Sequence, residues 1–338
     1  MKKITKTTKI TAIIMMMAML MLTMAGCGST DTKSSSDVEA SADAYHIGIL
    51  QLLEHPALDK ATEGFKAALV DKLGEENVVF DEQNAQGEQA NCATIANDFV
   101  SSGVDLILAN ATAALQSAAA ATADIPIVGT SITDYATALD VDDWTGTTGS
   151  NITGTSDLAP LDQQVEMITE LVPDVTTVGI LYCSAEANSK YQVNEVEKYL
   201  DEKNIAYKEY MAADSNEVQS VTTKAVSECD CLYIPTDNTM ANCTETINNV
   251  ASPAKVPIIC GEEGICKGCG VATLSIDYYD IGYAAGEMAY EILENGADPG
   301  EMEIQTAESV VKEYNEENCK NIGITVPDDY VAIDMSEE

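Results

Sequence analysis

Short apolar runs alternate with longer amphipathic segments along most of the chain. The first run, His46–Leu50, is followed by apolar positions at helical spacing from Leu58 to Leu73. Pro56 suits the first turn of that helix. Further strands are predicted over 78–80, 106–108 and 125–128, and helices over 89–100 and 113–121. This alternation is typical of a parallel sheet with helices on both faces.

The same alternation begins again in the second half. Strands are predicted over 178–182, 206–210, 232–234, 256–259 and 271–276. Helices are predicted over 161–171, 187–203, 218–226, 244–250 and 278–294. Two similar halves predict an α/β protein with two doubly wound parallel-sheet lobes and a cleft between them. The absence of a short-period sequence repeat argues against a solenoid.

The first 26 residues predict a secretion signal. Four lysines fall within 2–9, and the apolar run Ile10–Met24 has 15 residues, fewer than the roughly 20 that a membrane-spanning helix needs. The segment Met24-Ala25-Gly26-Cys27 resembles a bacterial lipoprotein box, in which the cysteine is lipidated and becomes the new N-terminus. We expect Cys27 to be that cysteine and 27–44 to be a flexible tether. An ordinary secretory signal with an incidental cysteine is the alternative.

The charge balance restricts the partners. The chain of 338 residues has a net charge of −39, and all 17 of its basic residues are lysine. So acidic a chain repels phosphate backbones, which argues against nucleic-acid binding. With only two histidines and no nucleotide-binding or nucleophile motif, the chain is not expected to be an enzyme or to hold a metal or cofactor.

Polar residues follow most of the predicted strands. Ligands of open α/β sheets bind beyond the carboxyl ends of the strands, so these residues are candidates for a binding site. Helix capping is the competing explanation for each of them. The candidates are Glu54, His55, Asn84, Thr112, Thr130, Ser131, Asp134, Asp157, Asn188, Asp237, Asn238 and Glu262.

An ordered set of short segments carries a family resemblance. The segments are Leu52–Asp59, Asn110–Ala114, Ile132–Asp134, Asn151–Gly154, Ser156-Asp157, Gln163–Glu166 and Pro235–Thr239. Together they resemble the substrate-binding lipoproteins of ABC transporters of the tryptophan/tyrosine type, over about Tyr45 to Pro327. The resemblance implies the type I periplasmic-binding-protein fold, in which two α/β lobes joined by a three-strand hinge close on a small ligand.

The resemblance also implies the ligand class, an amino acid with an aromatic side chain. Without arginine, its carboxylate has to be held by hydroxyls, backbone N–H groups and helix N-termini. Our hypothesis gives the carboxylate to Thr112 and Ser131, and the ammonium to Asp157 and Asp237. Four aromatic residues are candidates for stacking on the ligand: Tyr135, Trp144, Tyr182 and Tyr191. The acid-containing segment Cys260–Gly264 departs from the family pattern, and its extra acids would suit a polar or cationic ligand group.

The ten cysteines leave nine after Cys27, an odd number that cannot all pair within one chain. Cys229-x-Cys231 and Cys266-x-x-Cys269 are close pairs. Free thiols, a disulfide that fixes the 262–270 loop, and a metal site all remain open.

These observations predict an extracytoplasmic solute-binding lipoprotein of an ABC importer, anchored to the cell membrane and monomeric. Its first lobe is expected over 45–157 plus 276–300, and its second over 158–275 plus 301–338. It would deliver its ligand to a membrane permease by hinge closure. A sensing receptor of the same fold, or an extracellular α/β enzyme, is the alternative.

Overall fold

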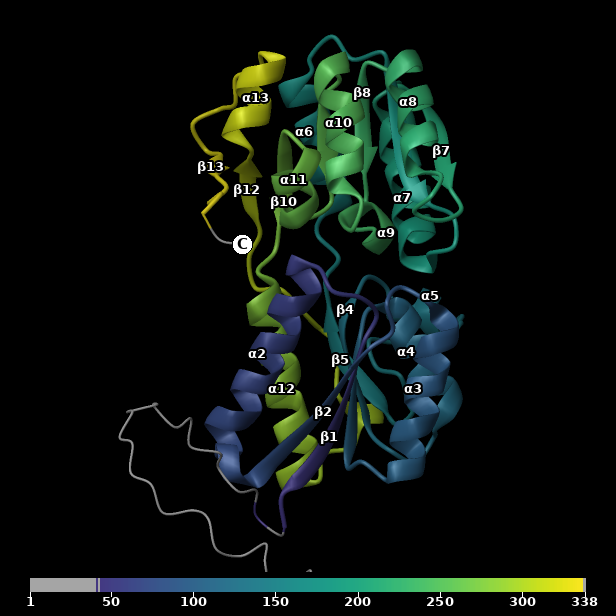
Figure 1. Cartoon of the computed structure of the whole chain (residues 1–338), viewed down its shortest axis with the longest axis vertical. Helices are drawn as coiled ribbons and strands as arrows, with labels where there is room; N and C mark the ends of the chain where they lie inside the picture. The colour runs from purple at the N-terminus through teal and green to yellow at the C-terminus, as the bar shows by residue number, and fades with distance from the viewer. Residues whose placement is uncertain (1–40, 42, 337–338) are drawn as a thin grey trace, which may run out of the picture. The chain divides into compact units, whose positions relative to one another are not determined.

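The computed structural model describes residue 41 and residues 43–336, in which two β-sheets form two lobes (Figure 1). The expected signal, Cys27 and most of the tether lie outside the described residues. The first lobe contains β1 (Tyr45–Gln51), α2 (Pro56–Leu73), η1 (Glu75–Asn77), β2 (Val78–Asn84), α3 (Gln89–Ser102), β3 (Leu106–Asn110), α4 (Thr112–Ala121), β4 (Ile127–Ile132), α5 (Tyr135–Leu139), β5 (Ile152–Ser156), α12 (Tyr278–Asn295), η2 (Pro299–Glu301) and β11 (Gln305–Thr306).

The first sheet is parallel throughout, in the order β11-β5-β4-β3-β1-β2. Its register brings the carboxyl ends of the strands to one edge, where Gln51 pairs with Asn110 and Asn110 with Thr130. Polar residues that follow different strands in the sequence therefore meet at this edge, as the alternating pattern predicted.

The second lobe holds the other sheet, in the order β13-β12-β10-β9-β8-β6-β7. Its elements are α6 (Leu161–Leu171), β6 (Thr177–Cys183), α7 (Ala187–Glu202), β7 (Ala206–Ala212), α8 (Val218–Glu228), β8 (Cys231–Ile234), α9 (Asn238–Ala241), α10 (Thr244–Ala254), β9 (Ile258–Cys260), α11 (Glu263–Cys269), β10 (Ala272–Ser275), β12 (Val311–Tyr314), α13 (Glu316–Ile322) and β13 (Val331–Ala332). This sheet departs from the purely parallel prediction in one pairing, because β12 runs antiparallel to β10.

Three chain segments connect the lobes. They are 157–160 between β5 and α6, 276–277 between β10 and α12, and 307–310 between β11 and β12. The lobe boundaries expected from the sequence stay a prediction, with one difference visible in the sheets. Gln305–Thr306, expected in the second lobe, pairs with β5 in the first because the chain adds an edge strand there before it crosses.

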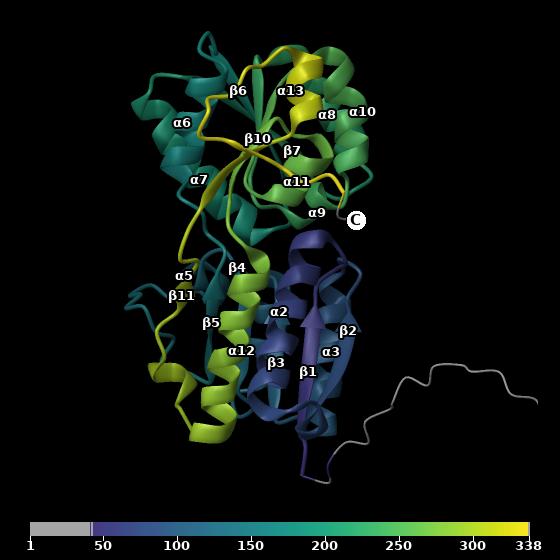
Figure 2. The same cartoon turned by 90° about the vertical axis from the view of Figure 1, so that its left-hand side faces the viewer.

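Helices α2 and α12 pack side by side on the first sheet (Figure 2). Glycines allow their backbones to approach closely: a Cβ on Gly282 would lie 2.0 Å from the carbonyl oxygen of Ala61, and one on Gly64 would lie 2.1 Å from that of Tyr279. The contact fixes the start of α12, and therefore Tyr278, relative to the first sheet.

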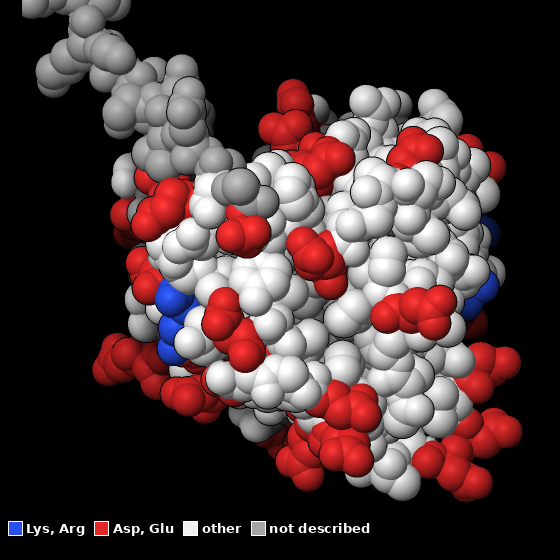
Figure 3. All heavy atoms as spheres, turned by 90° about the horizontal axis from the view of Figure 1, so that it is seen from below, with Lys and Arg blue, Asp and Glu red and all other residues white. Residues whose placement is uncertain are grey.

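The acidic side chains lie mostly at the surface. The face seen in Figure 3 carries many aspartates and glutamates and few lysines, as expected for a solvated acidic protein. Within the described residues, no helix combines the length and the hydropathy that crossing a membrane requires. Three acids, Asp157, Asp237 and Glu262, are instead almost completely buried.

Candidate functional site

The amino end of α4 lies beside the carboxyl end of β4. The Ala111 N–H donates to the Thr130 carbonyl at 3.1 Å, and no side chain caps the helix. The Ser131 hydroxyl at the same edge is buried with no hydrogen-bond partner in the described part of the chain. An uncapped helix N-terminus beside a free hydroxyl suits an anion such as a carboxylate. Thr112 opens this helix, so the structure brings together the two residues expected to hold the carboxylate.

The backbone is strained at the α4 N-terminus and at the end of β4. Ser131 has φ of 55° and Ala111 has φ of 87°, values that side-chain-bearing residues rarely adopt. The sequence pattern placed Thr130 and Ser131 in a loop after the fourth strand, but β4 continues through Ile132. Thr130 is fully buried and bonded through its hydroxyl to Thr155 on β5 at 3.1 Å, so its observed role is to join two strands.

A buried acidic cluster, which we define as Asp157, Glu262 and Tyr278, lies where the lobes join. Asp157 accepts hydrogen bonds from the hydroxyls of Thr133 and Tyr278, each at 3.1 Å. Glu262 precedes α11 and accepts from the N–H groups of Gly264 and Ile265. Thr133 and Tyr278 were not among the predicted site residues, because neither carries a charge. Thr133 nevertheless lies in Ile132–Asp134, one of the segments that carry the family resemblance.

Burial governs the protonation of both carboxyls. It raises the pKa of Asp157 to about 6, although the bonds from Thr133 and Tyr278 act in the opposite direction. It raises the pKa of Glu262 to about 7, and the negative charge of Asp157 adds to that rise. No lysine in the described residues lowers the pKa of either acid. The cluster is therefore a buried pair of acids without a counter-ion among the described residues, and a ligand cation would stabilise its ionised form.

Asp237 is buried in a different environment. Its carboxylate accepts from Met240 N at 2.8 Å, Cys183 N at 2.6 Å and Ser189 Oγ at 2.7 Å. Burial, followed by the charge of Glu186, raises the pKa of Asp237 to about 8. Three protein donors already engage this carboxylate, which leaves little capacity for a ligand ammonium. The Asp237 side chain caps α9 and connects that helix to β6 and α7 by hydrogen bonds.

Glu186 is the polar centre that sequence reasoning missed. Its carboxylate accepts from the backbone N–H and side-chain amide of Asn238, from the backbone N–H and hydroxyl of Thr239, and from the Asn188 amide. Two predicted site residues, Asn188 and Asn238, are thus held by one carboxylate. Glu186 lies in the polar loop after β6, where the pattern marked the loop without distinguishing this position.

His55 and Asn238 meet across the two lobes. The imidazole Nε2 lies 3.2 Å from Oδ1 of Asn238, and the His55 residue is 8% exposed. Asp134, at the start of α5, is also near the other lobe, since its charge contributes to the raised pKa of Tyr191 on α7 after the larger effect of burial. The structure therefore brings one predicted residue from each of two first-lobe loops to the second lobe.

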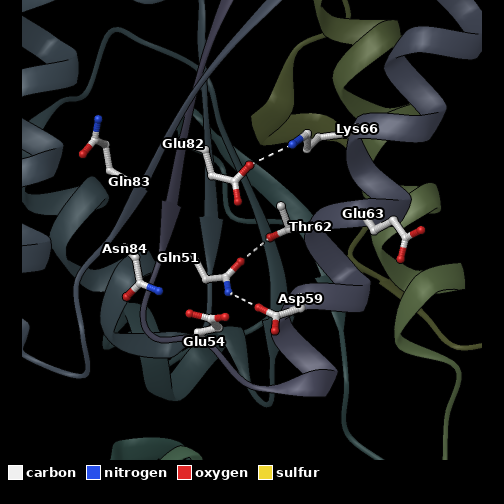
Figure 4. Close-up of a pocket in the computed structure, with 9 residues that line it drawn as sticks. All are labelled: Gln51, Glu54, Asp59, Thr62, Glu63, Lys66, Glu82, Gln83 and Asn84. Carbon is white, nitrogen blue, oxygen red and sulfur yellow. Dashed lines mark hydrogen bonds and ion pairs between the residues drawn. The ribbon is translucent and has the colours of Figure 1, made fainter. Parts of the chain in front are cut away.

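Two predicted residues, Glu54 and Asn84, lie elsewhere. Both are exposed and line an open pocket of about 540 Å³ that is formed by the first lobe alone (Figure 4). In this pocket Gln51 accepts from Thr62 and donates to Asp59. The Asn84 side chain accepts from the Gln86 N–H and stabilises the turn after β2. The structure does not group these residues with the buried acidic cluster.

Most of the aromatic candidates have structural partners. Tyr135 is stacked on Trp144 with 6.4 Å between ring centroids, and its hydroxyl donates to the Thr155 carbonyl. The Tyr182 hydroxyl donates to Glu209 on β7. Tyr191, on α7 where that helix contacts α5 of the first lobe, is the remaining candidate for stacking on a ligand.

The nine cysteines after Cys27 are all unpaired, and eight of them are buried. Among the described residues, no group of three or more His, Cys, Asp or Glu side chains has the arrangement of a metal site. Cys260 contacts Cys266 and Cys269, and burial raises the pKa of the Cys260 thiol well above its usual range. Burial thus makes the Cys260 thiol a weak nucleophile.

Similarity to known proteins decides the class of this site. Residues 46–336 match the family described as ABC transporter substrate binding protein. The chain belongs to the ABC transporter substrate-binding protein family. The resemblance seen in the sequence, the two-lobe type I fold and a solute-binding, non-enzymatic role are confirmed. Membership makes this substrate-binding protein an extracytoplasmic component that binds a small ligand for an ABC transporter.

Three relatives show how far the similarity extends. A tyrosine-binding protein of Clostridioides difficile (strain R20291) is 36% identical over 320 residues, 93% of this chain and 92% of that protein. An ABC domain from Streptococcus pneumoniae in complex with L-Trp is 34% identical, with a TM-score of 0.81 over 84% of this chain and 96% of that one. The ligand-free, open structure of a Clostridium difficile substrate-binding protein with adhesive properties is also 34% identical. Its TM-score is 0.66, over 86% of this chain and 99% of that one.

Proposed function

We propose that this substrate-binding protein captures an aromatic L-amino acid, tyrosine or tryptophan, between its lobes and delivers it to a membrane permease. The observation that carries the proposal is that two complementary features lie next to each other at the carboxyl edge of the first sheet, with Glu262 supplied by the second lobe. The buried acidic cluster suits an ammonium group, and the α4 N-terminus with Ser131 suits a carboxylate. The two features are adjacent, since the Asp157 N–H donates to the carbonyl of Ile132, the residue after Ser131.

This arrangement refines the hypothesis drawn from the sequence. The ammonium is assigned to Asp157 and Glu262, because the Asp237 carboxylate is occupied by three protein donors. The carboxylate is assigned to Ser131 and the first turn of α4, which begins at Thr112. The aromatic side chain is inferred from the tyrosine-binding and L-Trp-bound relatives, and Tyr191 is its proposed stacking partner.

Closure around the ligand is the proposed mechanism. Contacts from both lobes stabilise the closed state, so that ligand binding shifts the population toward it. The chain superposes better on the L-Trp complex than on the open relative at equal sequence identity, which supports an arrangement of the lobes that differs from that open one. We further propose that the protein acts as a monomer, tethered to the membrane through a lipid on Cys27.

Calorimetry and thermal shift with matched ligands test this function. L-Tyr, L-Trp and L-Phe are compared with tyramine, which lacks the carboxylate, and with N-acetyl-L-tyrosine, which lacks the ammonium. An amino acid at 100 times its dissociation constant should add roughly 2.7 kcal/mol to the free energy of unfolding. Both analogues should bind far more weakly than L-Tyr. Equal binding of L-Tyr and N-acetyl-L-tyrosine would contradict the ammonium assignment, and no binding of any aromatic amino acid would contradict the ligand class.

A further inference from the structure

One hydrogen bond joins the lobes through residues that are 183 positions apart. His55 ends the loop between β1 and α2, and Asn238 is the first residue of α9 in the second lobe. His55 Nε2 and Asn238 Oδ1 are 3.2 Å apart. The His55 side chain does not cap α2 although it occupies the N-cap position, so the helix start does not account for a histidine here.

Glu186 decides which way the Asn238 amide faces. The Asn238 Nδ2 lies 2.8 Å from Oε2 of Glu186, which also accepts the Asn238 backbone N–H at 3.0 Å. An ionised carboxylate accepts hydrogen bonds and donates none, so the NH₂ group must face Glu186. Oδ1 of Asn238 therefore faces His55, and the imidazole must donate from Nε2.

The acceptor for His55 is rigidly placed. Glu186 is itself fixed by the Thr239 N–H and hydroxyl, each at 2.8 Å, and by the Asn188 amide at 3.1 Å. Five hydrogen bonds fix the position of this carboxylate and leave Asn238 with a single orientation. The second lobe thus presents a preorganised acceptor, and the first lobe supplies the donor.

We propose that His55, Asn238 and Glu186 form a latch that stabilises the closed state, with His55 as a positioning residue rather than a ligand contact. The inference rests on the proposed ligand capture, because a latch between lobes matters when closure traps a ligand. Glu186 acts only through Asn238, since no bond connects it to the first lobe in the described residues.

Protonation of His55 should make the stability of the latch depend on pH. Burial lowers the pKa of His55, and the Asn238 bond and the charge of Glu186 oppose this without reversing it. The titratable groups near the latch are Glu186, whose charge acts on His55, and Asp237, which interacts with Glu186, while the neighbouring Glu54 is exposed. The latched ring therefore holds fewer protons than a solvated histidine, whose pKa is about 6.5. Acidification through that value favours the open state.

The histidine signals provide a ligand-independent test. The chain has two histidines, and His46 is the internal reference because it is exposed on β1. Nitrogen–proton NMR on the full folded protein reports the tautomer and pKa of both rings, with and without L-Tyr. We expect His55 to carry its hydrogen on Nε2 and to titrate below about 6.5, the value of a solvated histidine. Asn238→Leu removes a hydrogen bond that raises the His55 pKa, so it should lower that pKa further.

Binding measurements separate the latch from a ligand contact. His55→Leu and Asn238→Leu should each raise the dissociation constant for L-Tyr roughly 3- to 10-fold, the effect of one hydrogen bond. The double variant should be no weaker than either single variant, because both remove the same bond. His55→Gln keeps an N–H donor, so it should retain affinity and lose the histidine contribution to the pH dependence. His46→Leu is the matched control, and circular dichroism checks that every variant folds.

Each other outcome counts against the latch. Additive losses in the double variant mean that His55 contacts the ligand independently of Asn238, and unchanged affinity in both single variants means that the bond contributes nothing. A His55 ring that titrates at or above about 6.5, the value of a solvated histidine, with and without L-Tyr also overturns the proposal. If no amino acid binds, the proposed function fails, and the ligand-free NMR titration alone decides the latch.

Discussion

The Tyr278 hydroxyl donates to Oδ2 of Asp157 across 3.1 Å, and both residues are buried. Asp157 begins the first segment that crosses between the lobes, and Tyr278 starts α12 directly after the second. The bond therefore ties two of the three connections together. It also directs the phenol at a carboxyl group that has no counter-ion in the described part of the chain. The region where the lobes connect is therefore the region proposed to recognise the ammonium.

Affinity for the amino acid should rise with pH between 5 and 8. The raised pKa values of Asp157, about 6, and Glu262, about 7, mean that both acids are largely protonated at pH 5 and ionised at pH 8. Only the ionised forms attract an ammonium, so ligand binding releases protons in this window and strengthens as pH increases. Calorimetry across the range, in buffers of different ionisation enthalpy, measures both affinity and proton release.

Asp157→Asn should weaken binding at pH 8 by about 1.5–3 kcal/mol, the cost of losing a hydrogen bond to a charged group, and should flatten the pH profile. Asp98→Asn, an exposed carboxyl on α3, is the control and should leave affinity and profile unchanged. A profile for Asp157→Asn as steep as that of the unmodified protein would remove Asp157 from the ammonium site.

Ser131→Ala should cost affinity without costing stability. The Ser131 hydroxyl has no hydrogen-bond partner among residues 41 and 43–336, so its removal breaks no bond within that part of the ligand-free protein. A lost hydrogen bond to the ligand carboxylate should weaken binding roughly 3- to 10-fold, with unfolding free energy changed by less than about 0.5 kcal/mol. Ser117→Ala is matched to it as a buried serine of the same lobe that bonds the Ala113 carbonyl at 2.8 Å. Equal affinities for the two variants would exclude Ser131 from the ligand site.

Gly282→Ala should destabilise the first lobe by about 1–3 kcal/mol or more, because the new methyl would lie 2.0 Å from the Ala61 carbonyl oxygen and force α12 away from α2. Urea unfolding followed by circular dichroism measures the change. Glu287→Ala on the same helix removes only the exposed ion pair with Lys72 and should cost less than about 1 kcal/mol. Similar losses in both variants would show that the close helix contact contributes little.

Cys27→Ala should release the protein from the membrane. If a lipid on Cys27 is the only anchor, the variant appears in the soluble extracytoplasmic fraction, while the unmodified chain stays with the membrane until detergent is added. Cys243→Ala is the control, a half-buried cysteine of the folded body, and should not change the fractionation. A Cys27→Ala protein that remains membrane-bound after its signal is cleaved would contradict the lipid anchor.

Much of the fold could be predicted from local pattern. The Pro56 start of α2, the strands β1–β4 and β6–β10 and the long α12 follow from apolar periodicity and helix-start chemistry, whereas β11, β12 and β13 were not predicted. The strand β5 was not predicted, because Ile152–Ser156 contains one large apolar residue among threonine, glycine and serine. It is nevertheless buried, since its hydroxyls bond neighbouring residues such as Thr130. The hydrogen bonds that allow these hydroxyls to be buried come from other segments of the chain, so the local sequence pattern could not predict them.

The sequence by itself determined the family, the two-lobe architecture and the loops in which site residues lie, because each depends on residues close together in the chain. Only the tertiary structure decided which residues work together. The Asp237 carboxylate accepts hydrogen bonds from protein donors, whereas no described residue bonds the Ser131 hydroxyl. Tyr278 donates to Asp157, and Glu186 accepts from the Asn238 amide. Burial and hydrogen-bond saturation fix these roles, and both arise between segments that are up to 183 residues apart, as for His55 and Asn238.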